Sequence, residues 1–246
     1  MLAPDGRTAY NRPIMPPRSY DPQQFEMLTA HNPVRRRWHL NKLRLFQLVE
    51  IAPGGRVFDA GCGIGSLVFK VSPLCRLAIG CDRDLPFLTY GARKGRGGYV
   101  QADLQRLPFA DESFRVIFCQ EVLEHLERGV TLQVLEEFYR VLASNGQLLV
   151  TTPNYRSLWV LIEFLADTLG LAPDVAGGEH ISHYHRRTLA ETLTTAGFTI
   201  TKLGTFNHFS PFVAVLSDRW AERLSRWERK AGRGGGHLLY ALCQKP

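Results

Sequence analysis

The sequence predicts an α/β fold with a doubly wound, mostly parallel sheet. Short apolar stretches alternate with amphipathic segments between residues 56 and 151, and turns that contain glycine or asparagine separate them. This alternation is typical of parallel sheets, because each strand needs a crossover helix to reach its parallel neighbour. The last apolar stretch, residues 238–243, follows a glycine-rich linker. We expect it to join the sheet as an antiparallel strand.

Each element is predicted from its own residues. A basic amphipathic helix over 33–51 is expected to stop at the Pro-Gly-Gly of residues 53–55. Strands are expected at 56–59, 77–81, 98–101, 116–119 and 147–151, and helices at 65–71, from about 85, and at 130–142. Beyond Pro153 the patterns predict an apolar helix over 158–171, a loop rich in glycine and histidine at 176–185, a helix at 188–196, a strand at 198–203, a helix at 212–230 and the strand at 238–243.

The composition sets limits on partners and compartment. The net charge of +7 and the pI of about 9.3 favour acidic partners, although many enzymes with neutral substrates are equally basic. The five cysteines form no Cys-x-x-Cys pair, and their odd number argues against a disulfide framework. We therefore expect a protein of the reducing cytoplasm. The sequence has no apolar signal core at its start and no stretch long enough to cross a bilayer.

The turn after the first predicted strand reads Asp59-Ala60-Gly61-Cys62-Gly63-Ile64-Gly65. Glycines let the backbone approach a ligand closely and expose amide groups at a helix N-terminus. The next two strands end at Asp82 and Asp103. A carboxylate at the first of these positions can accept both ribose hydroxyls of a nucleoside, and one at the second can reach the exocyclic amine of adenine. Together these features predict a nucleoside-binding site.

The glycine spacing distinguishes between cofactors. A dinucleotide site would place Gly-x-Gly-x-x-Gly at this turn, whereas this chain has Gly-x-Gly-x-Gly after an acidic residue. That pattern, with Asp82, residues 102–104, 107–109 and 111–117 in the same order, resembles the class I S-adenosylmethionine-dependent methyltransferases over about residues 32–203. The resemblance implies a Rossmann-like fold, S-adenosylmethionine as methyl donor and S-adenosylhomocysteine as product. The residues expected to bind the cofactor are Asp59, Gly61, Cys62, Gly63, Gly65, Asp82, Arg83, Asp103 and Leu104.

Two further segments resemble a narrower group. Gln120-Glu121-Val122-Leu123-Glu124-His125-Leu126 and the upstream His31-Asn32-Pro33-Val34-Arg35 are similar to the quinone-biosynthesis O-methyltransferases of the methyltransferase type 11 group. This resemblance implies that Arg35 contacts the carboxylate end of the cofactor and that Gln120 lines the cofactor. The alternative for Arg35 is a place on a solvated basic helix face, because its neighbours are also basic.

Glu121, Glu124 and His125 suggest a metal site. Their i, i+3, i+4 spacing places them on one helical face if a helix begins there, and two carboxylates with an imidazole can hold Mg²⁺ or a similar ion. The small-RNA 2′-O-methyltransferases have a similar motif and a later histidine, which by order along the chain would be His180. The alternative is that Glu124 and His125 brace the helix and that no metal is used.

Methyl transfer is an in-line displacement at a sulfonium, so the enzyme mainly aligns acceptor and methyl carbon. A hydroxyl acceptor must also lose its proton. The residues predicted to be catalytic are His125 as the base, with Glu121 and Glu124 positioning it or a cation. The alternatives to a methyltransferase are a dehydrogenase of similar fold and a protein that keeps the cofactor pocket without turnover.

The resemblance divides the chain into an N-terminal arm (1–32), a cofactor-binding core (33–154), a helical lid or acceptor-binding insertion (155–187) and a C-terminal completion of the sheet (188–246). The apolar segment 158–171 and the later aromatic residues fit a small acceptor that is phenolic, quinone-like or otherwise lipophilic, and peripheral membrane contact. Packing on the core or in a dimer is the alternative. RNA, carbon and nitrogen acceptors stay open, although no aromatic–basic nucleic-acid module is visible. The sequence predicts no oligomeric state.

Overall fold

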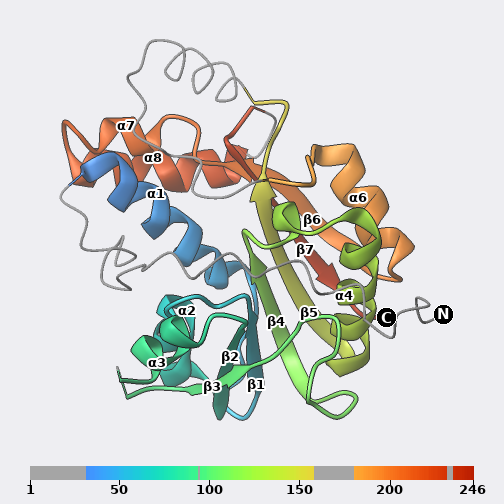
Figure 1. Cartoon of the computed structure of the whole chain (residues 1–246). Helices are drawn as coiled ribbons and strands as arrows, with labels where there is room; N and C mark the ends of the chain where they lie inside the picture. The colour runs from blue at the N-terminus through green and yellow to red at the C-terminus, as the bar shows by residue number, and fades with distance from the viewer. Residues whose placement is uncertain (1–31, 94, 158–179, 232–234) are drawn as a thin grey trace, which may run out of the picture.

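The computed structural model describes residues 32–93, 95–157, 180–231 and 235–246 (Figure 1). The predicted N-terminal arm up to residue 31 and the predicted apolar helix at 158–171 lie outside these residues. The described chain is built on a seven-stranded sheet of order β3-β2-β1-β4-β5-β7-β6. Strand β7 runs antiparallel to both of its neighbours, and the pairs among β1 to β5 are parallel. The predicted fold class is therefore confirmed.

The strands match the predicted apolar stretches, except that β5 begins five residues earlier and β6 ends three residues later than expected. They are β1 (Arg56–Ala60), β2 (Leu77–Asp82), β3 (Gly98–Gln101), β4 (Phe114–Gln120), β5 (Leu142–Pro153), β6 (Thr199–Phe206) and β7 (Leu238–Gln244). The helices are α1 (Pro33–Leu43), α2 (Ser66–Val71), α3 (Leu85–Arg93), α4 (Arg128–Val141), α6 (Arg186–Thr195), α7 (Ser210–Val213) and α8 (Asp218–Ala231). Short 3₁₀ turns lie at Arg44–Leu48, Ser72–Leu74 and Leu123–His125.

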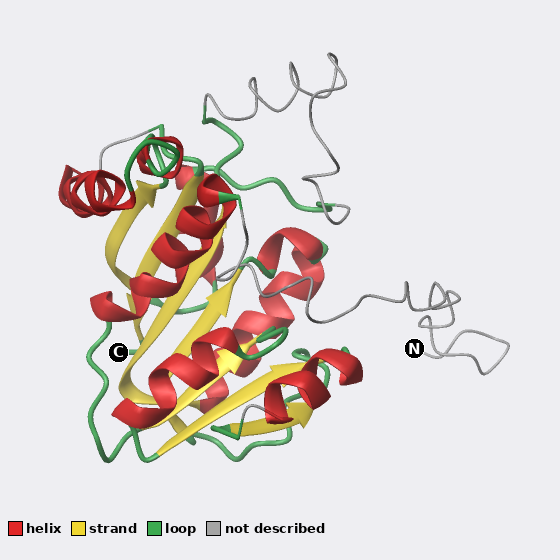
Figure 2. Cartoon of the chain, turned by 90° about the vertical axis from the view of Figure 1, so that its left-hand side faces the viewer, coloured by secondary structure: helices red, strands yellow, loops and turns green. Residues whose placement is uncertain are grey.

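Two apolar layers flank the sheet, and helices lie on both sides of it (Figure 2). Adjacent residues of β4 separate into the two layers, because successive side chains of a strand point to opposite faces. Ile117 packs with α4 and α6, while Phe118 packs with α2 and the segment that follows α1. Among the described helices, none combines the length and the apolar character needed to span a membrane.

Two predicted helices have different bounds in the structure. The helix expected over 33–51 ends at Leu43 and continues as a 3₁₀ turn. The single helix expected over 212–230 is two helices, because the chain turns after Val213 and restarts at Asp218. The hydroxyl of Ser217 accepts a hydrogen bond from the amide of Trp220 at 3.4 Å, as an N-cap serine does.

Helix α1 is fastened to α8 by buried polar contacts. The guanidinium of Arg37, which is 1% exposed, donates to the carboxylates of Asp218 and Glu222. One turn later, the Asn41 side chain donates to Asn207 at 2.8 Å and accepts from the Ser225 hydroxyl at 2.8 Å. Buried polar groups are stable only when such partners satisfy them. The contacts therefore fix how α1 and α8 lie against each other.

Candidate functional site

The glycine turn connects the end of β1 to α2 and is tied to the end of β2. The amides of Gly61 and Cys62 donate to the carbonyl of Cys81 at 2.8 and 2.9 Å. The amide of Gly63 donates to the Asp82 carboxylate at 2.8 Å. The predicted ribose-binding carboxylate therefore lies directly against the predicted cofactor turn.

Two glycines of this turn need their residue type. Gly61 and Gly63 have φ values of 71° and 51°, a region that other residues rarely adopt. A side chain at Gly61 would overlap Val122, whereas the space in front of Gly63 is open. The backbone of Gly63 can therefore meet a ligand closely, as a nucleoside site requires.

Asp59 is buried at the end of β1. Burial, and next the charge of Asp82, raises the pKa of its carboxyl to about 7, while Lys42 on α1 acts in the opposite direction. Lys42 also lowers the pKa of Glu121 and Glu124. This lysine is a cation shared by both halves of the site. Sequence reasoning missed it, because only the packing of α1 brings it near residues that follow β1 and β4.

Tyr99 on β3 is a second residue that the sequence analysis missed. Its hydroxyl is buried and has no hydrogen-bond partner within the described part of the chain. A side chain at Gly65 would meet this hydroxyl, so it lies beside the glycine turn. Burial, with smaller effects of Cys62 and Asp59, raises the pKa of Tyr99 to about 12. An unpaired buried hydroxyl at this position suits a polar ligand group such as the cofactor would bring.

The other predicted cofactor residues differ in burial. Arg83 and Asp103 are exposed, and the Asp103 carboxylate accepts from the amide of Gln105 at 2.9 Å. Leu104 is half-buried against the core, and Cys62 is half-buried beside Asp59 and Asp82. The cofactor-binding roles of these four residues stay predictions.

The two residues predicted to bind the cofactor from the α1 side, Arg35 and Gln120, have different surroundings in the structure. The Arg35 side chain is exposed in the first turn of α1, and the buried arginine of this helix is Arg37. The Gln120 side chain donates to the carbonyl of Lys42 at 3.3 Å, so it joins the end of β4 to α1. The solvated alternative for Arg35 therefore matches its place in the described structure.

The predicted common helical face for Glu121, Glu124 and His125 does not form. Glu121 has a φ of 57°, Leu123–His125 is a single 3₁₀ turn, and α4 begins only at Arg128. The hydroxyl of Thr151 donates to Glu121 at 2.8 Å, and that of Thr152 donates to Glu124 at 3.0 Å. Adjacent strand residues face opposite sides of a sheet. The two threonines therefore hold the two carboxyl groups apart.

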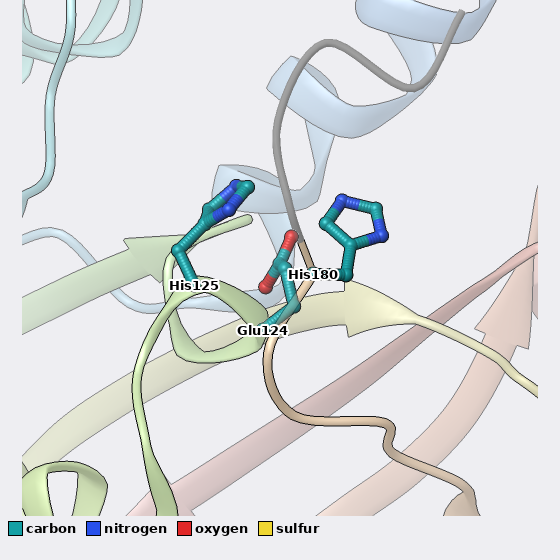
Figure 3. A group of neighbouring side chains, drawn as sticks. All are labelled: Glu124, His125 and His180. Carbon is teal, nitrogen blue, oxygen red and sulfur yellow. The ribbon is translucent and has the colours of Figure 1, made fainter. Parts of the chain in front are cut away.

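Glu124, His125 and His180 form a cluster, which we call the Glu-His-His cluster. Their ligand atoms lie within 4.8 Å of one another, and the Glu124 carboxyl points up between the two rings (Figure 3). The ring centroids of His125 and His180 are 5.1 Å apart. The described structure thus brings together three of the four predicted metal ligands. Glu121, the fourth, lies outside the cluster.

Backbone contacts carry His180 to this position. The amides of Ile181 and Ser182 donate to the carbonyl of Glu124 at 2.8 and 3.0 Å, and the Ser182 hydroxyl donates to the carbonyl of Leu126 at 2.6 Å. The loop before α6 is therefore pinned to the 3₁₀ turn after β4. A histidine far along the chain can join the cluster only because of this loop contact.

Burial favours the neutral forms of the Glu124 and His180 side chains. Burial, and next the charge of Glu121, raises the pKa of Glu124 well above its ordinary value. Burial, with His125 and His183, lowers the pKa of His180. The Tyr155 hydroxyl is hydrogen-bonded to Nδ1 of His180 at 2.5 Å, so Nε2 is the nitrogen that this ring can offer to a ligand. Tyr155 was not among the predicted residues.

The donor set fits a divalent cation. Ligand atoms bound to one such ion lie about 3.3 Å apart in tetrahedral geometry, so the cluster would need to contract by at most about 1.5 Å. Two imidazoles with one carboxylate suit Mn²⁺, Fe²⁺, Co²⁺ or Zn²⁺ better than Mg²⁺, which prefers oxygen ligands. The residues that would hold the ion are Glu124, His125 and His180.

The glycine turn and the Glu-His-His cluster are neighbours. Ala60 pairs with Cys119 across β1 and β4, and Val122 fills the space beside Gly61. Both groups therefore lie where β1 and β4 end, at the edge where parallel sheets of this class bind ligands. A ligand on the glycine turn and a second one at the cluster can meet there.

Comparisons with known proteins agree with this geometry. A family model described as a methyltransferase domain matches residues 58–150. A probable S-adenosylmethionine-dependent methyltransferase of Mycolicibacterium smegmatis is 34% identical over 109 residues, which are 44% of this chain and 42% of that protein. The malonyl-[acyl-carrier protein] O-methyltransferase of Legionella pneumophila is 36% identical over 118 residues, covering 44% of this chain and 40% of that protein. The chain spans about two fifths of the length of these relatives.

A solved structure extends the likeness across the fold. An S-adenosylmethionine-dependent methyltransferase of Thermotoga maritima, described as a possible histamine N-methyltransferase, superposes with a TM-score of 0.64 at 19% identity. The match covers 87% of this chain and 91% of that one. The O- and N-methyltransferase names of these proteins leave the acceptor atom open. Residues 58–150 therefore resemble a methyltransferase domain, and the chain shares its fold with a solved protein that is described as dependent on S-adenosylmethionine.

Proposed function

We propose that this protein transfers the methyl group of S-adenosylmethionine to a hydroxyl of a small lipophilic acceptor of phenolic or quinone-like type. The observation that carries the proposal is the Glu-His-His cluster beside the glycine turn. A phenol or another hydroxyl must lose its proton to become a good nucleophile, whereas an amine attacks through its lone pair. Two imidazoles next to the methyl donor supply what a hydroxyl acceptor needs.

The transfer follows from the residues at this edge. The acceptor oxygen forms a bond to the methyl carbon, the bond from sulfur to that carbon breaks, and the sulfur leaves as neutral S-adenosylhomocysteine. The hydroxyl proton passes to an imidazole, for which the exposed ring of His125 is the candidate. Glu124, held by Thr152, positions this ring and His180. The protein otherwise contributes alignment of the acceptor with the methyl carbon.

The charge distribution supports a cationic cofactor. Burial raises the pKa of the Asp59 and Glu121 carboxyls, and the Asp82 carboxylate accepts from the Gly63 amide of the glycine turn. A sulfonium that enters this environment favours the ionised carboxylates and is itself stabilised by them. Bound metal, where present in the cluster, would lower the pKa of the acceptor hydroxyl.

The cluster also supports one alternative. Glu124, His125 and His180 are residues of the motif that resembles the small-RNA 2′-O-methyltransferases, and the structure brings all three together. The alternative acceptor is therefore a ribose 2′-hydroxyl of RNA. RNA binding would weaken steeply with salt, because counterions are released from phosphate.

Replacement of the cluster residues tests the proposal. In His125→Ala and His180→Ala we expect turnover of a phenolic acceptor to fall by about a hundredfold or more. Cofactor affinity, measured by calorimetry, should stay within about twofold, since neither ring lies on the glycine turn. His208→Ala is the matched control and should leave turnover unchanged, because the His208 ring is hydrogen-bonded to Thr205 outside the cluster.

The acceptor class is tested with methyl-labelled cofactor against phenols, quinols, amines and RNA. Label in phenols or quinols supports the proposal. Label only in amines or RNA refutes it, as does full turnover of the two cluster variants. Removing metal with a chelator separates the two uses of the cluster: activity that falls and returns with Mn²⁺ or Zn²⁺ assigns a cation, and activity that persists assigns His125 alone as base.

A further inference from the structure

One side of α8 exposes large aromatic and aliphatic side chains together with arginines. We call this the α8 outer face and define it as Leu216, Arg219, Trp220, Arg223, Arg226 and Trp227. Leu216 is 89% exposed, and the two tryptophans are 62% and 65% exposed. Tryptophan side chains are highly buried on average in folded proteins. The exposure of two on one short helix therefore calls for a partner.

Helical spacing puts these residues in one stripe. Positions 220, 223 and 227 follow i, i+3 and i+7, so they line up along the helix, and Leu216 lies in the turn just before it. The guanidinium of Arg223 lies over the Trp220 ring at 5.1 Å from its centroid. The opposite side of the helix is buried, at Ala221, Ser225 and Glu228.

The acidic residues of α8 are turned away from this stripe. Asp218 and Glu222 are paired with Arg37 of α1. The Glu228 carboxylate accepts from the amide of Phe209 at 2.7 Å and from the hydroxyl of Ser210 at 2.6 Å. Among the described residues, Arg226 is the one outer arginine with an acidic neighbour, Glu222 at 3.6 Å. The α8 outer face is therefore positively charged as well as apolar.

The topology places this helix at the reactive edge of the sheet. Phe206, at the end of β6, pairs with Leu238, and Leu238 pairs with Pro153 at the end of β5. The chain enters α7 and α8 directly from that point, and both helices lie beside α1 at one end of the molecule (Figure 1). The α8 outer face and the Glu-His-His cluster thus belong to the same end of the sheet.

We propose that the α8 outer face docks on the surface of an anionic lipid bilayer. Tryptophans prefer the interfacial region, leucine enters the acyl boundary, and arginines meet anionic head groups. RNA fits less well, because the exposed aliphatic side chains of Val215 and Leu216 offer no ring for base stacking. A symmetric dimer through this face would bring the arginine stripes of two copies together, which is repulsive. The docking does not depend on which acceptor is methylated.

Vesicle binding tests this proposal on the whole 246-residue chain. We expect sedimentation with vesicles of phosphatidylcholine and phosphatidylglycerol and weak sedimentation with phosphatidylcholine alone. Arg219→Gln with Arg223→Gln should weaken binding by about thirtyfold, since each arginine near an anionic surface contributes a factor of about five. Trp220→Ser with Trp227→Ser should weaken it by about tenfold or more, because it removes the apolar insertion.

The control is Leu74→Ser with Arg76→Gln, which removes an exposed leucine and a nearby arginine outside α8 and should leave binding unchanged. Circular dichroism establishes that every variant is folded. The proposal is overturned by equal binding of wild type and both α8 variants, by no binding to anionic vesicles, by RNA binding that the α8 variants lose while vesicles are ignored, or by a dimer that dissociates in those variants. A negative result in the vesicle assay would overturn the docking proposal alone, because the assay does not measure methyl transfer.

Discussion

Asp59 makes the stability of this protein depend on pH. Its carboxyl is buried, and its pKa is raised from 3.8 to about 7, first by burial and then by Asp82. Replacing it by the nearly isosteric asparagine, Asp59→Asn, removes the titration and keeps the side-chain volume. The folded state binds the Asp59 proton more tightly than the unfolded chain does.

The sign and size follow from this difference. The contribution of protonated Asp59 is fully present below pH 3.8 and is lost as the pH rises through about 7. At about 1.4 kcal/mol for each pKa unit, the full loss is about 4 kcal/mol, of which about 2.5 kcal/mol falls between pH 5 and pH 8. Relative to Asp59→Asn, the wild type should therefore become less stable across this range.

Urea unfolding of the cofactor-free protein, followed at several pH values from 5 to 8, measures the effect. The quantity compared is the difference in unfolding free energy between wild type and Asp59→Asn, so that other titrating groups cancel. Asp103→Asn, at an exposed carboxylate, is the control and should track the wild type. Parallel curves for wild type and Asp59→Asn would refute the assignment of a buried, proton-holding carboxyl.

Three further predictions concern the cofactor turn and α1. Asp82→Ala removes the acceptor for the Gly63 amide and should weaken cofactor binding by about a hundredfold in calorimetry; unchanged affinity would contradict the site. Lys42→Met removes the cation that lowers the pKa of Asp59, so the decline in stability with pH should extend to higher pH, and an unmoved profile would place Lys42 elsewhere. Arg37→Met removes the buried guanidinium that pairs with Asp218 and Glu222 and should reduce the unfolding free energy by about 2 kcal/mol; Arg36→Met is the matched control, and equal values in urea unfolding would count against the contact.

The fold could be predicted because its determinants are local. The apolar stretches that became β1 to β4 are short, and their bounds agree with the structure to within about two residues. The glycine turn was readable for the same reason, since Gly61, Gly63 and Asp82 follow strands in a fixed order. The prediction of one continuous helix over 212–230 was wrong. The apolar–basic pattern shows no break there, yet the chain leaves the helix after Val213, and Ser217 caps the start of a second helix.

The acceptor side resisted prediction because packing over long sequence distances forms it. Three consecutive arginines, 35 to 37, are equivalent by composition, and the contact with α8 about 180 residues later decides that Arg37 is buried. Glu121 fits the motif by spacing, yet its positive φ turns it out of register with Glu124. Tyr155 could not be predicted as a partner of His180, because only the folded loop before α6 brings the two side chains together.

Lys42 acts electrostatically on carboxyl groups both at the glycine turn and after β4. Its charge acts on Asp59 at the cofactor turn and on Glu121 and Glu124 after β4, so one cation favours the ionised form of all three carboxyls. A sulfonium that binds near Asp59 favours the ionised form of these carboxyls, because opposite charges lower a carboxyl pKa. An ionised Glu124 in turn makes the neighbouring imidazoles better proton acceptors. In the proposed reaction, binding of the methyl donor would therefore prepare the Glu-His-His cluster to take the proton of an acceptor hydroxyl, and loss of the cation as S-adenosylhomocysteine forms would reverse that preference.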